Sequence, residues 1–146
     1  MKVNDLMNSK GKAVVSIDVG DSVEDAIRLM HTSKISAVIV KEQDKIAGIF
    51  TERDVVRAYI GKMDRKFREI PLRETMTTDI IVAELKDDLS DIMSVMVEKN
   101  IRHLPVVDES DRGKLIGMLS IRDIIQIQVK KITSELHYLR DYITGG

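Results

Sequence analysis

The amino-acid sequence predicts an α+β fold made of two similar halves, each with the order strand, helix, strand, strand, helix. The first observation is a nine-residue motif that occurs at 48–56 and again at 117–125, an offset of 69 positions. Both copies read glycine, two apolar residues, a hydroxyl residue, any residue, Arg, Asp and two β-branched residues. The second observation is that strand and helix patterns recur around both copies in one order. Such self-similarity indicates an internal repeat.

The first half contains these elements in order. A strand is predicted at 14–17, and Asp21 and Ser22 then precede a helix whose apolar residues recur at spacings of three and four. The run 35–40 is rich in β-branched residues, which favour a strand. The first motif copy predicts a buried strand that ends at Thr51, where a second helix begins. The apolar face of the first helix comprises Val23, Ala26, Ile27 and Met30.

The second half repeats this order. A strand is predicted at 80–83, a helix begins near Asp87, and a strand at 101–106 precedes the second motif copy. The helix face that matches the first half comprises Leu89, Ile92, Met93, Met96 and Val97.

Beyond the motif, the two halves match with two differences in length. The first half has three extra residues at about 10–12, and the second has a longer turn at 108–114. The segment 5–7 corresponds to 74–76 at the same offset of 69. Residues 62–68 are basic without apolar periodicity, as a solvated connector is. The predicted domains are therefore a first repeat at 1–61, a linker at 62–72, a second repeat at 73–129 and a helical extension at 130–146.

The motif has two physical interpretations. A hydroxyl side chain between a strand and a helix can cap the helix, and Asp three residues later suits the positive end of the helix dipole. Alternatively, a helix N-terminus with a hydroxyl and an Arg can hold a phosphate, and the Asp can accept hydrogen bonds from a ribose. Duplication favours ligand binding, because a cap alone requires neither this Arg nor this Asp.

Composition limits the class of protein. A chain of 146 residues forms one domain or two small interlocked halves, since about seventy residues bury only a modest core. The formal net charge of −1 provides no bulk attraction to nucleic acid or to an anionic membrane. No segment has the length of a membrane span, and no apolar stretch follows the first residues as in a signal peptide. Without cysteine there are no disulfides. We expect a cytoplasmic protein.

An apolar stripe continues through the last predicted helix. Its residues step by four, four, three, four, three and four, which is close to a heptad pattern. A single small domain rarely needs so long a stripe for its own core. We therefore expect part of it to contact another chain or domain, although folding back over its own sheet is the alternative. The stripe comprises Ile121, Ile125, Val129, Ile132, Leu136, Leu139 and Ile143.

With both motifs and the repeated element order, the chain resembles a pair of CBS domains, the module named after cystathionine β-synthase, in its stand-alone form. The resemblance covers the chain from its start to about Val129. Its most specific segments are 48–54 in the first half and 104–108 with 117–123 in the second. The resemblance implies two repeats packed pseudo-symmetrically through their sheets, with two clefts. Each cleft would hold AMP, ADP, ATP, S-adenosylmethionine or a dinucleotide, and two such pairs would form a homodimer.

The resemblance also implies roles for particular residues. In the second half, Asp123 would bind the ribose, and Ser120 and Arg122 would lie near the phosphate. In the first half, Asp54, Thr51 and Arg53 would have these roles. The base would be lined in the second half by Thr78, Asp79, Ile80, His103, Leu104 and Pro105. Apart from the resemblance, His103 beside Arg102 has two interpretations, an approach to a phosphate or an ordinary surface histidine at a strand edge. In the first half Ser36, Ala37 and Val38 replace the His-Leu-Pro region, and Ile39 stands where the proline is expected.

The residues do not predict an enzyme. No nucleophile is paired with a base, and each motif Asp follows an Arg that favours a permanently charged role. The three histidines lack zinc-ligand spacing. We therefore expect a regulatory module that binds an adenosine ligand and acts on an unknown partner protein, with no catalytic cofactor. The alternatives are a nucleotide-independent interaction or dimerisation module, and a protein that binds nucleic acid or a metal ion.

Overall fold

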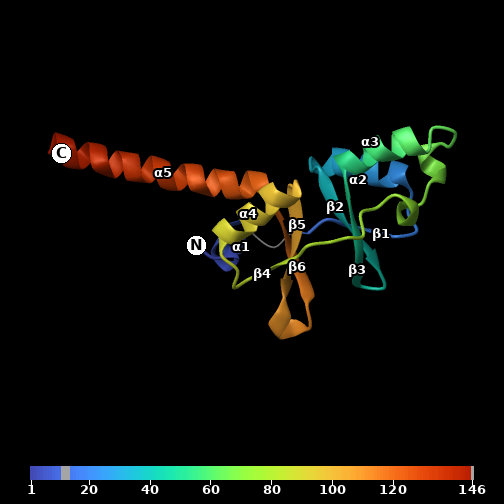
Figure 1. Ribbon diagram of the computed structural model, residues 1–146, viewed down its shortest axis with the longest axis horizontal. Coiled ribbons are helices and arrows are strands. Elements are labelled where there is room, and N and C mark those ends of the chain that lie inside the picture. Colours follow the sequence, from blue (N-terminus) through green and yellow to red (C-terminus); the bar gives the residue numbers. More distant parts are fainter. Residues whose placement is uncertain (11–13, 146) are drawn as a thin grey trace. The chain divides into compact units, whose positions relative to one another are not determined.

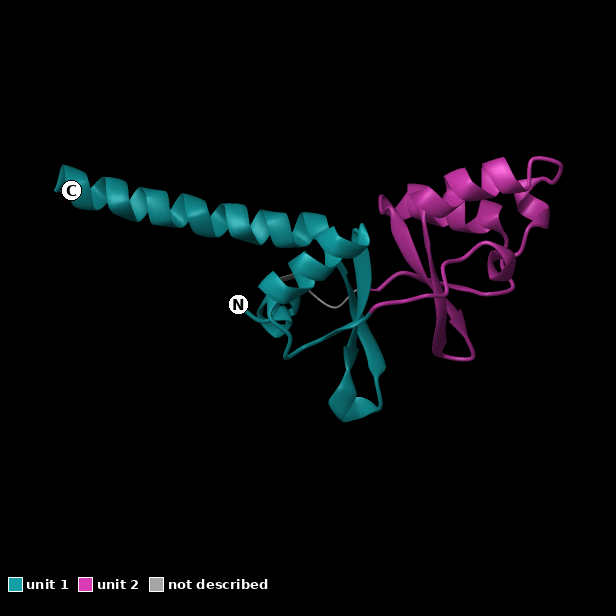
Figure 2. Ribbon diagram, viewed as in Figure 1, with its two compact units in different colours: residues 1–12, 82–146 teal, residues 13–81 magenta. Residues whose placement is uncertain are grey.

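The computed structural model describes residues 1–10 and 14–145 and divides into two compact units (Figures 1 and 2). The first-repeat unit comprises residues 14–81, and the second-repeat unit comprises residues 1–10 and 82–145. Residues 11 and 12 of the predicted insertion lie outside the described residues. Each unit has one three-stranded sheet, and a long helix ends the chain, which confirms the α+β prediction.

The first-repeat unit has the predicted order of elements. Its sheet has the order β1-β2-β3, with β1 parallel to β2 and β2 antiparallel to β3. The first strand is later than predicted, because only residues 16–18 pair with β2. The elements are β1 (Ser16–Asp18), α2 (Val23–Ser33), β2 (Ala37–Glu42), β3 (Lys45–Thr51), α3 (Glu52–Gly61) and the short 3₁₀ helices η1 (Phe67–Glu69) and η2 (Leu72–Glu74).

The second-repeat unit has the same topology, with sheet order β4-β5-β6 and the same strand directions. Both sheets also have a register shift at equivalent places, at Val40/Lys41 and at Val106/Val107. The duplication therefore includes irregular features of the sheet. The elements are α1 (Val3–Lys10), β4 (Ala83–Glu84), α4 (Leu89–Lys99), β5 (His103–Asp108), η3 (Glu109–Asp111), β6 (Lys114–Ser120) and α5 (Ile121–Thr144).

The segment that precedes each repeat packs on the other repeat: residues 1–10 pack on the second repeat, and the segment that leads into the second repeat packs on the first. The backbone N–H of Val3 donates to the carbonyl of Asp87 at 2.8 Å, and the N–H of Leu72 donates to that of Asp21 at the same distance. These bonds are equivalent, since Val3 and Leu72 are 69 positions apart. Figure 2 shows that the start of the chain and the second half form one unit. The two repeats therefore exchange their N-terminal segments, so that each segment belongs to the unit formed by the other repeat.

Each unit has its own apolar core. In the second-repeat unit, Val3, Leu6 and Met7 of α1 are buried with residues of α4, β5 and β6. In the first-repeat unit, Ile70 and Leu72 are fully buried among residues of α2, β2 and β3. Burial of apolar side chains of this size is the main favourable contribution to folding. Residues of α1 are therefore part of the second-repeat core, and Ile70 and Leu72 are part of the first-repeat core.

Residues 62–72, predicted as a linker, divide into two parts. The charged side chains at 62–68 are mostly exposed, as expected, whereas the end of the segment is packed into the first-repeat core. Arg65 Nη1 lies 2.6 Å from Glu74 Oε2 and fastens this segment to η2. The hydrogen bond from Arg65 lowers the pKa of the Glu74 carboxyl. Because folding lowers this pKa, the ionised Glu74 carboxylate stabilises the folded state at neutral pH. This contribution is lost as the carboxyl is protonated in acid.

Candidate functional site

The first motif copy forms the start of α3. Thr51 is the N-cap residue, and its hydroxyl accepts a hydrogen bond from the backbone N–H of Asp54. In return the Asp54 carboxylate accepts from the N–H of Thr51 at 3.0 Å. This reciprocal pair is a capping box, which satisfies two backbone donors at the helix start. Arg53, between these two residues, is exposed.

Asp54 has further partners inside the first-repeat unit. Its side chain is only 3% exposed, and its Oδ1 accepts from Arg57 Nη2 at 2.6 Å and from Thr77 Oγ1 at 2.9 Å. Arg57 also donates to the carbonyl of Thr75 at 2.9 Å. Both carboxylate oxygens are therefore hydrogen-bonded within the protein. This network compensates the cost of burying the charge.

Replacing Arg57 with alanine is expected to lower the free energy of unfolding by about 1.5 kcal/mol, because it removes a charged hydrogen bond from a buried carboxylate. The effect is at the low end for such bonds, since the Arg57 side chain is 63% exposed. Urea denaturation followed by circular dichroism measures it. The matched control is Arg28→Ala on α2, whose exposed pair with Glu24 at 3.6 Å contributes under ~0.5 kcal/mol. Equal losses in both variants would contradict a structural role for Arg57.

The second motif copy forms the start of α5 in the second-repeat unit. Ser120 is the N-cap residue, its hydroxyl accepts from the N–H of Asp123 at 3.1 Å, and Asp123 accepts from the N–H of Ser120 at 3.1 Å. Asp123 is half-buried, and Arg122 is exposed. The positions equivalent to Arg57 and Thr77 are Gln126 and Asn8. The residue types that fix Asp54 are therefore not repeated here.

The capping boxes use Asp54 and Asp123, so the prediction that a cap requires neither the Arg nor the Asp is wrong for the Asp. The same capping box occurs at the start of α2, where Ser22 and Asp25 exchange bonds of 3.1 and 3.0 Å. That helix lies outside the motif and has no Arg beside the Asp. The Ser or Thr with the Asp is thus explained by local structure. The adjacent Arg is the part of the motif that capping does not require.

The predicted base-lining residues of the second half lie on β5 and just before it. His103 is half-buried and pairs in register with Ser120, so their side chains lie on one face of the sheet. Leu104 is fully buried in the core of its own unit. Its side chain is therefore not available to line a pocket, although its backbone remains at the strand. Pro105 alternates with it on the other face, and Arg102 is exposed.

The corresponding residues of the first half lie on β2 and just before it. Ala37 pairs in register with Thr51, as His103 does with Ser120, and Val38 is buried in the core as Leu104 is. Ser36 is half-buried. The remaining predicted residues, Thr78, Asp79 and Ile80, belong to the first-repeat unit, with the first two exposed and the third half-buried.

Within the second-repeat unit the structure brings together a hydroxyl, a carboxylate and an imidazole. Ser120 and Asp123 share a capping box, and His103 lies opposite Ser120 across the two strands. Arg122, in the first turn of α5, is exposed. This combination can donate to an anion and accept from hydroxyl groups. The set formed by His103, Ser120, Arg122 and Asp123 is called the α5 start below.

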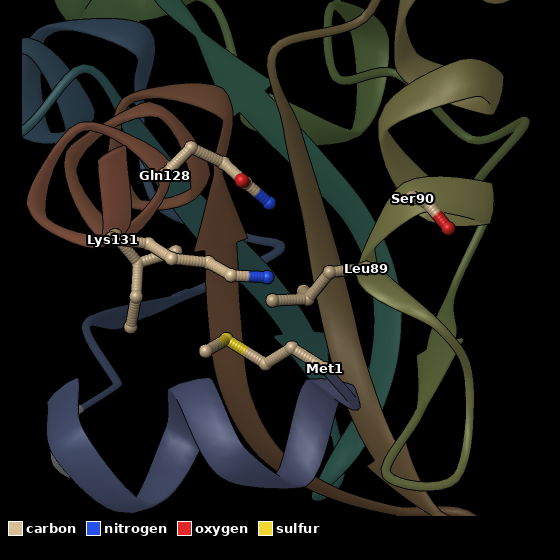
Figure 3. A pocket seen from close by; sticks show the side chains of 6 residues that line it. Met1, Leu89, Ser90, Gln128 and Lys131 are labelled. Atoms are coloured by element: carbon tan, nitrogen blue, oxygen red, sulfur yellow. The ribbon is translucent and has the colours of Figure 1, made fainter. Parts of the chain in front are cut away.

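A pocket of about 190 Å³ lies elsewhere in the same unit (Figure 3). None of the predicted ligand residues is among the side chains that form it. The described residues contain no cluster of three or more potential metal ligands. Among them, no helix is long and apolar enough to cross a membrane. The pocket is lined by Met1, Leu89, Ser90, Ile127, Gln128 and Lys131.

Comparison with known proteins gives consistent matches. A family model described as CBS domain matches residues 3–61 and again 68–130. The CBS domain-containing protein CBSX3, mitochondrial, of Arabidopsis thaliana is 33% identical over 153 residues, which cover 99% of this chain and 72% of that protein. The crystal structure of the CBS domain NE2398 is 35% identical with a TM-score of 0.81, and the match covers 88% of this chain and 98% of that one.

Another solved structure is similar in fold. The CBS domain pair of protein MJ0100, crystallised in complex with 5′-methylthioadenosine and S-adenosyl-L-methionine, has a TM-score of 0.77 at 22% identity, over 90% of this chain and 98% of that one. Some curated relatives are much longer than the matched region. The matches cover 53% of a relative from Methanopyrus kandleri and 39% of one from Methanocaldococcus jannaschii.

Proposed function

Since this chain belongs to the CBS domain family, we propose that it is a non-enzymatic regulatory module that binds an adenosine compound and thereby changes its interaction with a partner protein. The observation that supports this most is the α5 start, where a duplicated motif retains an exposed Arg122 that helix capping does not require. The adenosine ligands bound by the MJ0100 domain pair indicate the class of compound.

The second motif copy is the better candidate for the ribose site. Asp54 is buried and holds both Arg57 and Thr77, so a ribose hydroxyl would have to displace a charged hydrogen bond there. Asp123 is half-buried, and the half-buried His103 pairs in register with Ser120, the capping partner of Asp123. We therefore assign the ribose to Asp123, the phosphate or other polar group of the ligand to Ser120, Arg122 and His103, and a weaker or structural role to Asp54.

Regulation would follow from linkage. A ligand shifts the equilibrium between free and partner-bound states only by its difference in affinity for the two. The mechanism therefore requires that the occupied and unoccupied forms of this protein differ in affinity for the partner. The cytoplasmic location expected from the sequence stays a prediction.

Titration calorimetry tests the ligand assignment. The full chain is titrated with AMP, ADP, ATP, S-adenosylmethionine, 5′-methylthioadenosine and NAD, and one compound is expected to bind above the others. Asp123→Asn keeps a side-chain oxygen for the cap but removes the charge, and we expect it to weaken binding by about 10- to 100-fold, as for loss of a charged hydrogen bond.

The control for this variant is Asp25→Asn, which makes the same change in the α2 capping box outside the motif. It is expected to leave affinity unchanged. Equal weakening by both variants would mean that Asp123 acts only through helix stability. Unchanged affinity in Asp123→Asn would remove Asp123 from the site, and no binding by the wild-type chain to any compound of the panel would refute the proposed function.

A second candidate function rests on α5. Its apolar stripe is exposed along the part of the helix beyond the second-repeat core, as a nucleotide-independent interaction module would require. Absence of binding to every compound of the panel, together with self-association of the chain, would favour this candidate.

A further inference from the structure

The helix α5 has two apolar faces with different surroundings. Ile121, Ile124 and Ile127 step by three and pack on the core of the second-repeat unit. At about 100° per residue, the stripe that begins at Ile125 lies roughly a quarter turn away from that face. Ile121, which the sequence pattern assigned to the stripe, belongs instead to the core face.

The stripe itself is exposed. Ile125, Val129 and Ile132 are 51–55% exposed. From Lys130 to Gly145 every described residue of the chain is exposed, and α5 extends beyond the rest of its own unit (Figure 1). Isolated helices of about 15 residues are marginal in water, and this segment contains β-branched and aromatic residues that favour helix only weakly. The exposed helix therefore needs a partner that covers the stripe.

The spacing of the stripe defines the geometry of that partner. From Ile125 onward the steps are four, three, four, three and four, which is a heptad pattern with apolar residues at the two positions that form a coiled-coil seam. These nineteen residues extend over about 27 Å. The seam comprises Ile125, Ile132 and Leu139 at one heptad position (d) and Val129, Leu136 and Ile143 at the other (a).

The flanking charges specify the occupant. Glu135 and Arg140 occupy the g and e positions beside the seam, five residues apart. In a parallel pair in register, a g residue faces the e residue of the next heptad on the other helix. Glu135 of each copy would therefore face Arg140 of the other, twice per pair. In the symmetric antiparallel register, which places Ile132 opposite Leu136, Glu135 would instead face its own counterpart.

We infer that the exposed part of α5 is a self-association surface, on which a second copy of this chain docks as a parallel, in-register coiled coil through the seam from Ile125 to Ile143. The inference does not depend on the proposed ligand, since none of the seam residues belongs to the α5 start.

The absence of cysteine from the sequence allows a direct test. Leu139→Cys in the full chain places one thiol on the seam, where identical positions meet in a parallel pair. Under mild oxidation we expect a disulfide-linked dimer on non-reducing electrophoresis. The control is Ser134→Cys, an exposed position on the outer side of the same helix, which should remain monomeric in that assay. Failure of Leu139→Cys to cross-link, or equal cross-linking of both variants, would overturn the inference.

Charge exchange tests the orientation by sedimentation velocity. Each of the two single variants, Glu135→Lys and Arg140→Glu, places like charges opposite each other in the parallel pair. Each should therefore weaken association. The double variant Glu135→Lys/Arg140→Glu restores opposite charges and should associate as the wild type does. In an antiparallel pair, Glu135 faces Glu135 in the wild type and two lysines would face each other after Glu135→Lys, so this change alone would not weaken association; that result would overturn the parallel orientation. A monomeric wild-type chain at high concentration would also refute the inference. Unchanged urea midpoints would show that the variants remain folded.

Discussion

Replacing Leu72 with alanine is expected to lower the free energy of unfolding of the first-repeat unit by about 2–5 kcal/mol, the usual range for Leu→Ala in a core. Leu72 is fully buried in that core, and its backbone N–H bonds to Asp21 at 2.8 Å. The loss combines the removed apolar contact with the cavity that remains. Urea denaturation followed by far-ultraviolet circular dichroism measures it.

A control for Leu72 exists in the same predicted linker. The Met63 side chain is 71% exposed, so Met63→Ala should change the free energy of unfolding by under ~0.5 kcal/mol. If the segment were a solvated connector throughout, both substitutions would have the same small effect. That result would contradict the exchange of segments described above.

Replacing Gly48 with alanine is expected to lower the free energy of unfolding by about 1–3 kcal/mol, as overpacking of a core does. A Cβ built on Gly48 would lie 2.7 Å from the carbonyl oxygen of Thr77 and 2.8 Å from Met76 Sδ. The carbonyl cannot move freely, because it accepts from the N–H of Ile49 at 2.9 Å. Thermal and urea denaturation both report this loss.

Gly117, the equivalent glycine of the second motif copy, provides the comparison. A Cβ there would clash with the terminal methyl of Met7, which is the end of a flexible side chain. We therefore expect Gly117→Ala to cost less than Gly48→Ala, although both glycines occupy the same place in the motif. A larger loss at Gly117 would show that Met7 is fixed more firmly than the Thr77 backbone.

Most of the fold could be predicted from the sequence because its signals are local. The helix starts at Ser22, Thr51 and Ser120 follow from side chains that bond to neighbouring backbone groups. The register of the sheets also confirms that Ile39 and Pro105 are equivalent, each two residues after the residue that pairs with the motif hydroxyl. Repetition of each pattern gave two independent observations of each element.

The exchange of segments could not be predicted in the same way. Val3, Leu6 and Met7 have helical spacing, and this pattern indicates an apolar face. It does not indicate which of the two cores receives that face, because both cores are built from apolar residues on the same sheet topology. The choice depends on contacts between residues more than eighty positions apart.

The candidate site could be predicted only in part. The motif pointed to Asp54 and Asp123 equally, since the local sequence around them is the same. Their difference arises from Arg57, a turn further along α3, and from Thr77, which arrives from a distant part of the chain. Likewise, alternation along β5 places Leu104 in the core, which a list of motif residues does not reveal.

The exchange of segments also determines the order in which the protein can fold during its synthesis. The first-repeat unit is continuous in sequence, so it can be completed once residue 81 has left the ribosome. The second-repeat unit needs the earliest and the latest residues, and Val3 must wait for Asp87 to be made. During that time the apolar face of α1 remains exposed to chaperones and to other nascent chains. Slow translation at any point between α1 and the end of the second half would therefore prolong an aggregation-prone intermediate, whereas the first-repeat unit needs no residue beyond 81.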